Sequence, residues 1–109
     1  MATTTFSNYV AKNVGISAST LVTAGGTAQT SVIGLCCANT TSTAVTVDVY
    51  LTKSGVDYYV VKGATVPQGG SLVAVGGDQK LVMAANDSLK VVASTASCID
   101  VIVSALVVT

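Results

Sequence analysis

Side chains that perform acid–base chemistry are few in this chain of 109 residues. His, Glu, Arg and Trp are absent, and the carboxyl side chains are Asp48, Asp57, Asp78, Asp87 and Asp100. General acid–base catalysis usually recruits His, Glu or Asp in a cleft. Asp48 and Asp57 lie on adjacent predicted strands, which allows a pair of carboxylates, whereas the simpler interpretation is that all five are solvated strand and turn residues. We therefore predict no catalytic residue and a chain that is not an enzyme.

Three cysteines, Cys36, Cys37 and Cys98, do not form a recognisable reactive or metal site. A cysteine or serine nucleophile needs a base, normally His, and structural zinc needs four Cys or His ligands. Cys36 and Cys37 point to opposite faces of an extended strand and so rarely pair, whereas a bridge from Cys98 to either one stays open. We predict reduced thiols that pack as small hydrophobic side chains, and no metal or cofactor.

Carbohydrate recognition is a remaining small-ligand function, because sugar rings stack on aromatic side chains. The aromatic residues are Phe6, Tyr9, Tyr50, Tyr58 and Tyr59. Tyr58 and Tyr59 are consecutive on a predicted strand, so their rings point to opposite faces of a sheet. One ring then belongs to the core or an interface, and the other to the surface or an interface. A host-glycan-binding module is therefore an alternative function, and Tyr58 and Tyr59 are candidate interface residues.

The charge content of the chain excludes several classes of partner. Only 9% of the residues are charged, the formal net charge is zero, 50% of the residues are hydrophobic and the mean hydropathy is +0.70. Nucleic acids and anionic membranes attract basic surfaces, so neither is predicted as a partner. The apolar run at 101–108 is too short to span a membrane, which takes about 20 residues. Little repulsion separates copies at neutral pH, which favours self-association.

The pattern of hydrophobic residues predicts an all-β fold. Twenty valines and fifteen threonines suit a pleated sheet, and apolar residues recur at spacing two, most clearly in Val45, Val47, Val49 and Leu51. Gly, Asn, Asp, Ser and Pro clusters mark turns between the segments. The predicted strands are 6–14, 19–24, 30–38, 43–53, 57–63, 71–76, 80–84, 88–94 and 98–108. We predict a single antiparallel β-sandwich domain over residues 1–109, jelly-roll-like or Ig-like, with about eight to nine short strands.

Two predicted strands are apolar on both faces, which a two-layer sandwich does not explain. The segment 32–37 is one of them. In the last strand, Ile102, Leu106 and Val108 lie on the face opposite to Ile99 and Val101. A sandwich buries one face of each sheet, so another surface must cover the second face. A subunit interface that includes Ile102, Leu106 and Val108 is the prediction, and a closed barrel or a covering loop is the alternative.

Strand and turn segments between residues 30 and 108 carry a resemblance to a known class of protein. They are Ile33-Gly34-Leu35, Ala38-Asn39-Thr40-Thr41, Val45-Thr46-Val47-Asp48-Val49-Tyr50, Gly55-Val56-Asp57-Tyr58-Tyr59, Val66-Pro67-Gln68-Gly69-Gly70-Ser71-Leu72, Gly77-Asp78-Gln79-Lys80-Leu81 and Asp87-Ser88-Leu89-Lys90-Val91. The chain resembles small β-sandwich structural proteins of tailed bacteriophage particles. These segments are strand and turn patterns and include no catalytic motif.

The resemblance implies a non-enzymatic virion structural protein. Its first placement is a decoration (cement) protein that binds the outside of the capsid shell and stabilises it, as a homo-oligomer with a trimer favoured. Its second placement is a neck, tail or fibre-associated protein. The implied partners are further copies of the chain and the major capsid protein or other virion proteins, on the virion after synthesis in the host cytoplasm. We predict no secretory signal peptide, and the Thr-rich start at residues 1–5 is either a flexible arm or a frayed terminus.

Overall fold

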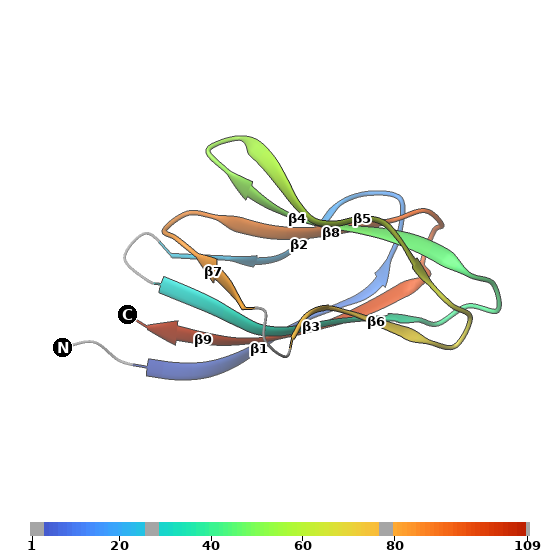
Figure 1. The fold of residues 1–109 in the computed structure, drawn as a ribbon, viewed down its shortest axis with the longest axis horizontal. Helices are drawn as coiled ribbons and strands as arrows, with labels where there is room; N and C mark the ends of the chain where they lie inside the picture. The colour runs from blue at the N-terminus through green and yellow to red at the C-terminus, as the bar shows by residue number, and fades with distance from the viewer. Residues whose placement is uncertain (1–3, 26–28, 77–79, 109) are drawn as a thin grey trace.

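The computed structural model describes residues 4–25, 29–76 and 80–108, and these residues form strands and connecting loops without a helix (Figure 1). The strands are β1 (Thr4–Val14), β2 (Ser19–Thr23), β3 (Gln29–Asn39), β4 (Val45–Lys53), β5 (Val56–Val66), β6 (Ser71–Val75), β7 (Leu81–Met83), β8 (Ser88–Ala93) and β9 (Ile99–Val108). All nine predicted strands are present, and no boundary differs from the prediction by more than three residues. The predicted all-β fold class is confirmed.

The strands form two antiparallel sheets that lie one above the other (Figure 1). The first sheet has the order β1-β9-β3-β6, with β7 also paired to β3, and the second sheet has the order β2-β8-β4-β5. An immunoglobulin sandwich keeps its first two strands side by side, whereas here β1 and β2 lie in different sheets. The order is that of a jelly roll, in which most connections cross between the sheets. Of the two predicted topologies, the jelly roll is therefore the one observed.

The core lies between the sheets and is built from alternate residues of each strand. In β9 the burial alternates, with Ile99, Val101 and Val103 buried and Ile102 exposed. β4 shows the predicted inward face of alternating valines. Tyr50 departs from this alternation: it is only 8% exposed, although it is one of the β4 residues that alternate with the inward valines.

The segment at Ser54-Gly55, predicted as a turn, joins β4 and β5. The β4–β5 hairpin turns through Ser54 and Gly55, both with positive φ (52° and 79°), as tight two-residue hairpins require.

Of the predicted arm at residues 1–5, residues 1–3 lie outside the described part of the chain. Thr4 and Thr5 belong to β1 and pair with Val108 and Val107.

Candidate interaction surface

The aspartates that the sequence suggested as a pair are held separately. Asp48 Oδ1 accepts a hydrogen bond from the Gly63 amide at 2.6 Å, and its other oxygen lies 3.8 Å from the Lys62 ammonium. Asp57 accepts a hydrogen bond from the Thr52 hydroxyl at 2.8 Å. Thr52 is four residues beyond Asp48 on β4, which is about 13 Å along a strand. The two carboxylates therefore do not share a site, and each has a structural role.

Two buried polar residues stabilise loops and were not identified from the sequence. Asn39 donates from Nδ2 to the carbonyls of Thr43 (2.7 Å) and Val66 (3.1 Å), while its Oδ1 accepts from the amide and hydroxyl of Thr41 (2.9 and 2.7 Å). The sequence signal was the Asn-x-Thr spacing, because an Asn side chain that bonds the amide two residues on is an Asx turn.

Asp87 is the second buried polar residue, so the expectation that all five aspartates are solvated was wrong for this one. Its carboxylate accepts from the Ala84 amide at 2.9 Å and pairs with the Lys53 ammonium at 3.3 Å. The ion pair ties the β7–β8 turn to the end of β4. Among the described residues, every buried side-chain nitrogen or oxygen has a hydrogen-bond partner, and no cluster of three metal-ligating side chains is found.

The cysteines are free, as predicted: Cys37 and Cys98 are buried and Cys36 is half-buried. Burial, followed by the neighbouring Cys36, raises the pKa of the Cys37 thiol to about 12. A thiol with such a pKa stays protonated at neutral pH and is a poor nucleophile. Burial is also the first cause that raises the pKa of the Tyr50 hydroxyl, followed by the charges of Asp57, Tyr59 and Asp48.

The raised pKa of Cys37 predicts a pH dependence of stability. The ordinary pKa of a cysteine thiol is 9.0, so below pH 9 the thiol is protonated in both the folded and the unfolded chain. Between pH 9 and 12 the unfolded chain releases this proton while the folded chain retains it, and the free energy of unfolding falls as the pH rises. We expect urea midpoints of the natural chain to fall more steeply above pH 9 than those of Cys37→Ala. Parallel curves for the two proteins would contradict the assignment.

The two candidate tyrosines lie on β5 of the second sheet. Tyr59 is opposite Tyr50, with ring centroids 5.1 Å apart, and the Lys62 ammonium lies 4.4 Å from the Tyr59 centroid. Tyr58 is opposite Leu51 and is 55% exposed. Consecutive residues of a strand point to opposite faces, and with Tyr59 47% exposed as well, neither ring is buried in the core. Tyr59 covers Tyr50, which explains the low exposure of Tyr50 on an outward face.

The largest group of exposed hydrophobic side chains lies on the side of the first sheet that faces away from the core. We call this side the outer face. Its exposed hydrophobic residues, 37% to 78% accessible, are Phe6, Val10, Ile33, Val73, Val82 and Ile102. A fully exposed side chain of this kind offers about 60–120 Å² of apolar area, so the six partly exposed ones together present roughly 400 Å². Patches of this size on a single chain often mark interaction sites.

The strand register places four of the outer-face residues in one row. Ile102 of β9 is opposite Val10 of β1 on one side and Cys36 of β3 on the other, and Cys36 is in turn opposite Val73 of β6. Val10, Ile102 and Val73 are exposed and Cys36 is half-buried. The row therefore forms an apolar band that crosses every strand of the β1-β9-β3-β6 path.

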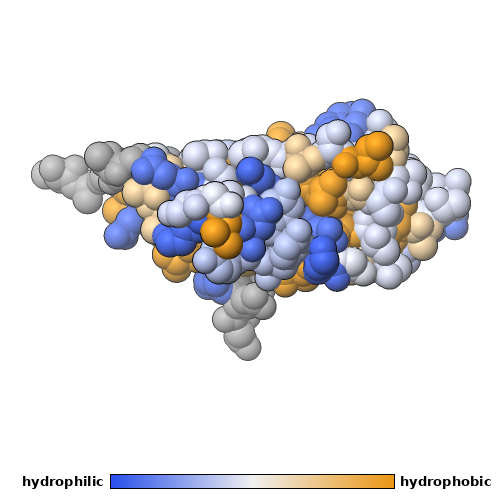
Figure 2. Space-filling model, turned by 90° about the horizontal axis from the view of Figure 1, so that it is seen from above, coloured by the Kyte–Doolittle hydropathy of each residue, from blue (hydrophilic) through white to orange (hydrophobic). Residues whose placement is uncertain are grey.

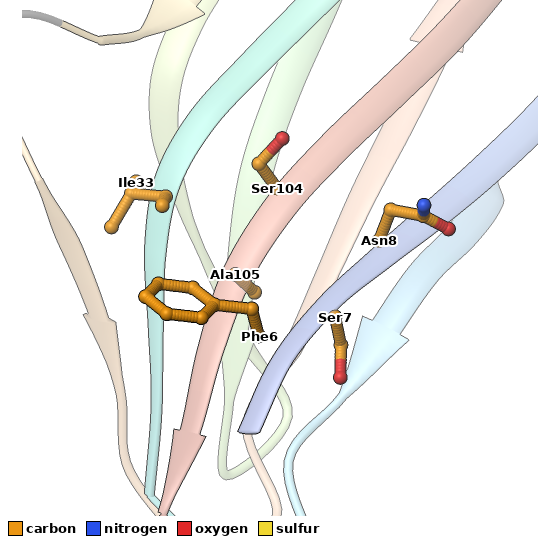
Figure 3. A pocket seen from close by; sticks show the side chains of 6 residues that line it. All are labelled: Phe6, Ser7, Asn8, Ile33, Ser104 and Ala105. Carbon is orange, nitrogen blue, oxygen red and sulfur yellow. The ribbon is translucent and has the colours of Figure 1, made fainter. Parts of the chain in front are cut away.

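A shallow depression of about 320 Å³ lies beside this row. Its lining includes Phe6 and Asn8 of β1, Ile33 of β3 and Ser104 of β9. Figure 3 shows that the Phe6 ring extends across β9 toward Ile33. Ile33 protrudes where the β3–β9 register shifts between Val32 and Gly34. The depression is open to solvent, and its lining combines the exposed side chains of Phe6 and Ile33 with the polar side chains of Asn8 and Ser104.

The charged residues are distributed unequally between the sheets. Among the described strands of the first sheet, the charged residues are Lys12 and Asp100, which pair with each other at 3.5 Å at one end of the outer face. The strands of the second sheet carry Asp48, Lys53, Asp57, Lys62 and Lys90. Figure 2 looks down on the second sheet and shows hydrophilic residues that interrupt the hydrophobic ones. The low charge of the chain is thus concentrated away from the outer face.

The candidate interface residues fall into two separate groups. Ile102 and Leu106 lie on the outer face, where Ile102 is exposed and Leu106 is half-buried, and Val108 is half-buried near the end of β9. Tyr58 and Tyr59 lie on the other sheet, so the structure does not bring them together with the β9 residues. Sequence reasoning missed Phe6 and Val10, which are more exposed than any of the five.

Comparisons with known proteins give no relative at the level of sequence. No family model matches the chain, and no curated protein matches it significantly. No helix long and apolar enough to cross a membrane is found among the described residues.

Solved structures share the fold. A chain from the study "Bacillus endospore appendages form a novel family of disulfide-linked pili" superposes with a TM-score of 0.53 at 13% identity, over 99% of this chain and 88% of that one. A chain of the T13 viral particle of infectious bursal disease virus superposes with a TM-score of 0.56 at 14% identity, over 98% of this chain and 30% of that one. The present chain thus spans less than a third of the viral chain. At such identities the likeness establishes a shared β fold with components of a pilus and a virus particle, and nothing finer.

Proposed function

We propose that this chain is a non-enzymatic structural subunit of a protein assembly, and that its outer face packs against a neighbouring protein. The observation that carries the proposal is the outer face itself: an apolar band across the first sheet whose two strand charges neutralise each other at one end. Protein interfaces are depleted of charge at their centre and are rich in apolar and aromatic side chains. The roughly 400 Å² of apolar area is about half of the ~800 Å² that each partner contributes to a standard interface.

The finer form of the proposal is a decoration protein on the capsid shell of a tailed bacteriophage. The resemblance of residues 30–108 to phage virion proteins supports this placement. The solved neighbours, which come from a virus particle and a pilus, support a role in an assembly. The chain would bind the outside of the shell through its outer face and act together with further copies of itself. Neck, tail or fibre placement is the alternative within the same structural role.

Stabilisation of a shell by such a subunit is mechanical. A shell that holds a packaged genome is under outward pressure. A subunit bound across shell-protein boundaries adds contact area, on the order of 1,600 Å² per standard interface, that expansion would have to break. Many symmetric copies add their modest affinities, so the shell gains more than any single contact provides.

Immunogold electron microscopy of purified phage particles from cells that produce this chain tests the proposal. We expect gold in regular positions over the shell, and a stoichiometry by mass spectrometry of many copies per particle. Gold confined to the neck, tail or fibres would overturn the capsid placement and retain the structural role. A chain found in the cells and absent from every particle and filament would overturn the structural role as well.

A further inference from the structure

The four edges of the two sheets differ in how well they are protected from pairing with another chain. Proteins protect edge strands by keeping them short, by charged residues and by bulges. β5 carries Asp57 and Lys62, and its register with β4 shifts twice. β2 has five residues and a register shift, and β6 and β7 have only five and three residues. Three of the four edges are therefore poor templates for a further strand.

The fourth edge, β1, lacks these protections over its first seven residues. From Thr4 to Val10 it pairs with β9 in continuous register, without a charged residue or a proline. Lys12 and the left-handed Asn13 (φ 57°) come only after this stretch, where the register also shifts. The inward residues Ser7 and Tyr9 remain half-buried, whereas the β9 residues opposite them, Ala105 and Val103, are buried. β1 is thus a regular, uncharged edge with incomplete cover.

We propose that β1 pairs antiparallel with β1 of a second copy around a two-fold axis, which joins the two first sheets into one continuous sheet. The proposal deepens the proposed structural function and rests on it for its biological role. The zero net charge of the chain favours approach of a second copy, and the uncharged edge offers its free backbone groups without like-charge repulsion.

The side chains on β1 select the register of this pairing. Residues 4, 6, 8 and 10 point to the outer face, and a two-fold register centred on any residue of β1 keeps them on that face in both copies. Such centres include Ser7, Asn8 and Tyr9. The register centred on Asn8 places Phe6 of one copy opposite Val10 of the other, twice, with Asn8 against Asn8 between them. Centres at Ser7 or Tyr9 place Phe6 opposite Asn8 or Lys12 instead. Aromatic and β-branched residues form favourable cross-strand pairs, so Asn8 is the centre.

The pairing has a consequence for the outer face. Both copies present this face on the same side of the joined sheet, so the apolar band of each copy, which ends at Val10, continues onto Phe6 of the other copy. A dimer then offers a partner assembly twice the apolar area of one chain. Once one copy of the dimer is bound, binding of the other copy is an intramolecular step, which raises the overall affinity. A two-fold contact builds a dimer, which departs from the trimer that the phage resemblance favours.

Cysteine cross-linking tests the register, in a Cys36→Ser background that removes the half-buried native thiol. Residues directly opposite in an antiparallel pair have Cα atoms about 4.5–5.5 Å apart, within the range for a disulfide. We expect Asn8→Cys to give mostly covalent dimer under mild oxidation at micromolar concentration. Ser7→Cys is the matched control, since Ser7 faces Tyr9 in this register and should stay monomeric on a non-reducing gel. Cross-linking through Ser7→Cys alone would overturn the Asn8-centred register.

A second variant tests the pairing without relying on oxidation. Asn8→Lys places two ammonium groups against each other at the axis, so light scattering should show a monomer at concentrations where the natural chain is a dimer. Ile16→Lys introduces the same charge in the exposed loop after β1, away from the stretch Thr4–Val10, and should remain a dimer. A natural chain that is monomeric or strictly trimeric in solution would overturn the pairing, even if the chain is found on particles. A dimer that is absent from all particles would instead overturn the proposed function and leave the pairing in place.

Discussion

Ile102→Lys is expected to weaken binding of the chain to its assembly partner by more than 100-fold while the chain stays folded. Ile102 is 57% exposed at the middle of the apolar row, between Val10 and Cys36. Burying its exposed part in an interface contributes about half of the ~1.5–3 kcal/mol of a full side chain, and a buried unpaired ammonium adds a desolvation cost of several kcal/mol. Since 1.4 kcal/mol corresponds to a factor of ten, the sum exceeds two orders of magnitude. The effect is measured as a change in dissociation constant. Purified chain is added to particles assembled without it, and the bound fraction is quantified after the particles are sedimented.

Ile16→Lys is the matched control for this substitution. Ile16 is also an exposed isoleucine, 70% accessible, and lies in the loop between β1 and β2 outside the outer face. The control should bind within about twofold of the natural chain, and both variants should keep its circular dichroism spectrum. Equal binding by Ile102→Lys and the natural chain would show that the outer face is not the contact surface.

Asn39→Ala is expected to cause the largest loss of stability among single substitutions of polar residues. The side chain is 4% exposed and makes four hydrogen bonds that join the β3–β4 loop to the end of β5. Its removal leaves the buried Val66 carbonyl and the half-buried Thr41 amide without these partners, and an unsatisfied buried group costs about 1–3 kcal/mol. We expect a loss of about 3 kcal/mol in the free energy of unfolding, measured by urea denaturation.

The control for Asn39 is Thr43→Ala. Thr43 contributes its backbone carbonyl to the network, and its side chain is exposed. Its truncation should change the free energy of unfolding by no more than about 0.5 kcal/mol, as is usual for surface positions. If Asn39→Ala were as mild as Thr43→Ala, the Asn39 hydrogen bonds would not be stabilising the loop.

The strands could be predicted because burial on one face imposes a period of two on the sequence. The alternation in β4 and β9 and the Ser54-Gly55 turn are local signals, and the structure confirms them. Sheet order was not predictable, because β1 pairs with β9 and β2 with β8 across most of the chain. Short strands and turns are shared by jelly rolls and immunoglobulin folds, so local patterns did not separate the two.

The exposed apolar residues of the outer face were predicted in part. The excess of apolar residues on β9 led to Ile102 and Leu106, because no sandwich core accommodates both faces of one strand. Phe6 and Val10 were missed because β1 mixes polar and apolar residues on both faces, and only the β9 register shows which face is outward. Tyr58 is exposed for another reason: it lies close to the β4–β5 turn, which in Figure 1 projects away from the first sheet.

Thiol footprinting of the assembled particle tests most directly whether the outer face is a contact surface. Cys36 lies within the apolar row of that face, while Cys37 and Cys98 are buried in the core and serve as internal references. In the free subunit a small alkylating reagent should modify Cys36 and leave the other two unmodified. In the intact particle Cys36 should be protected as well, and it should react again once the particle is dissociated. Equal modification of Cys36 in the free subunit and in the particle would contradict the proposed contact.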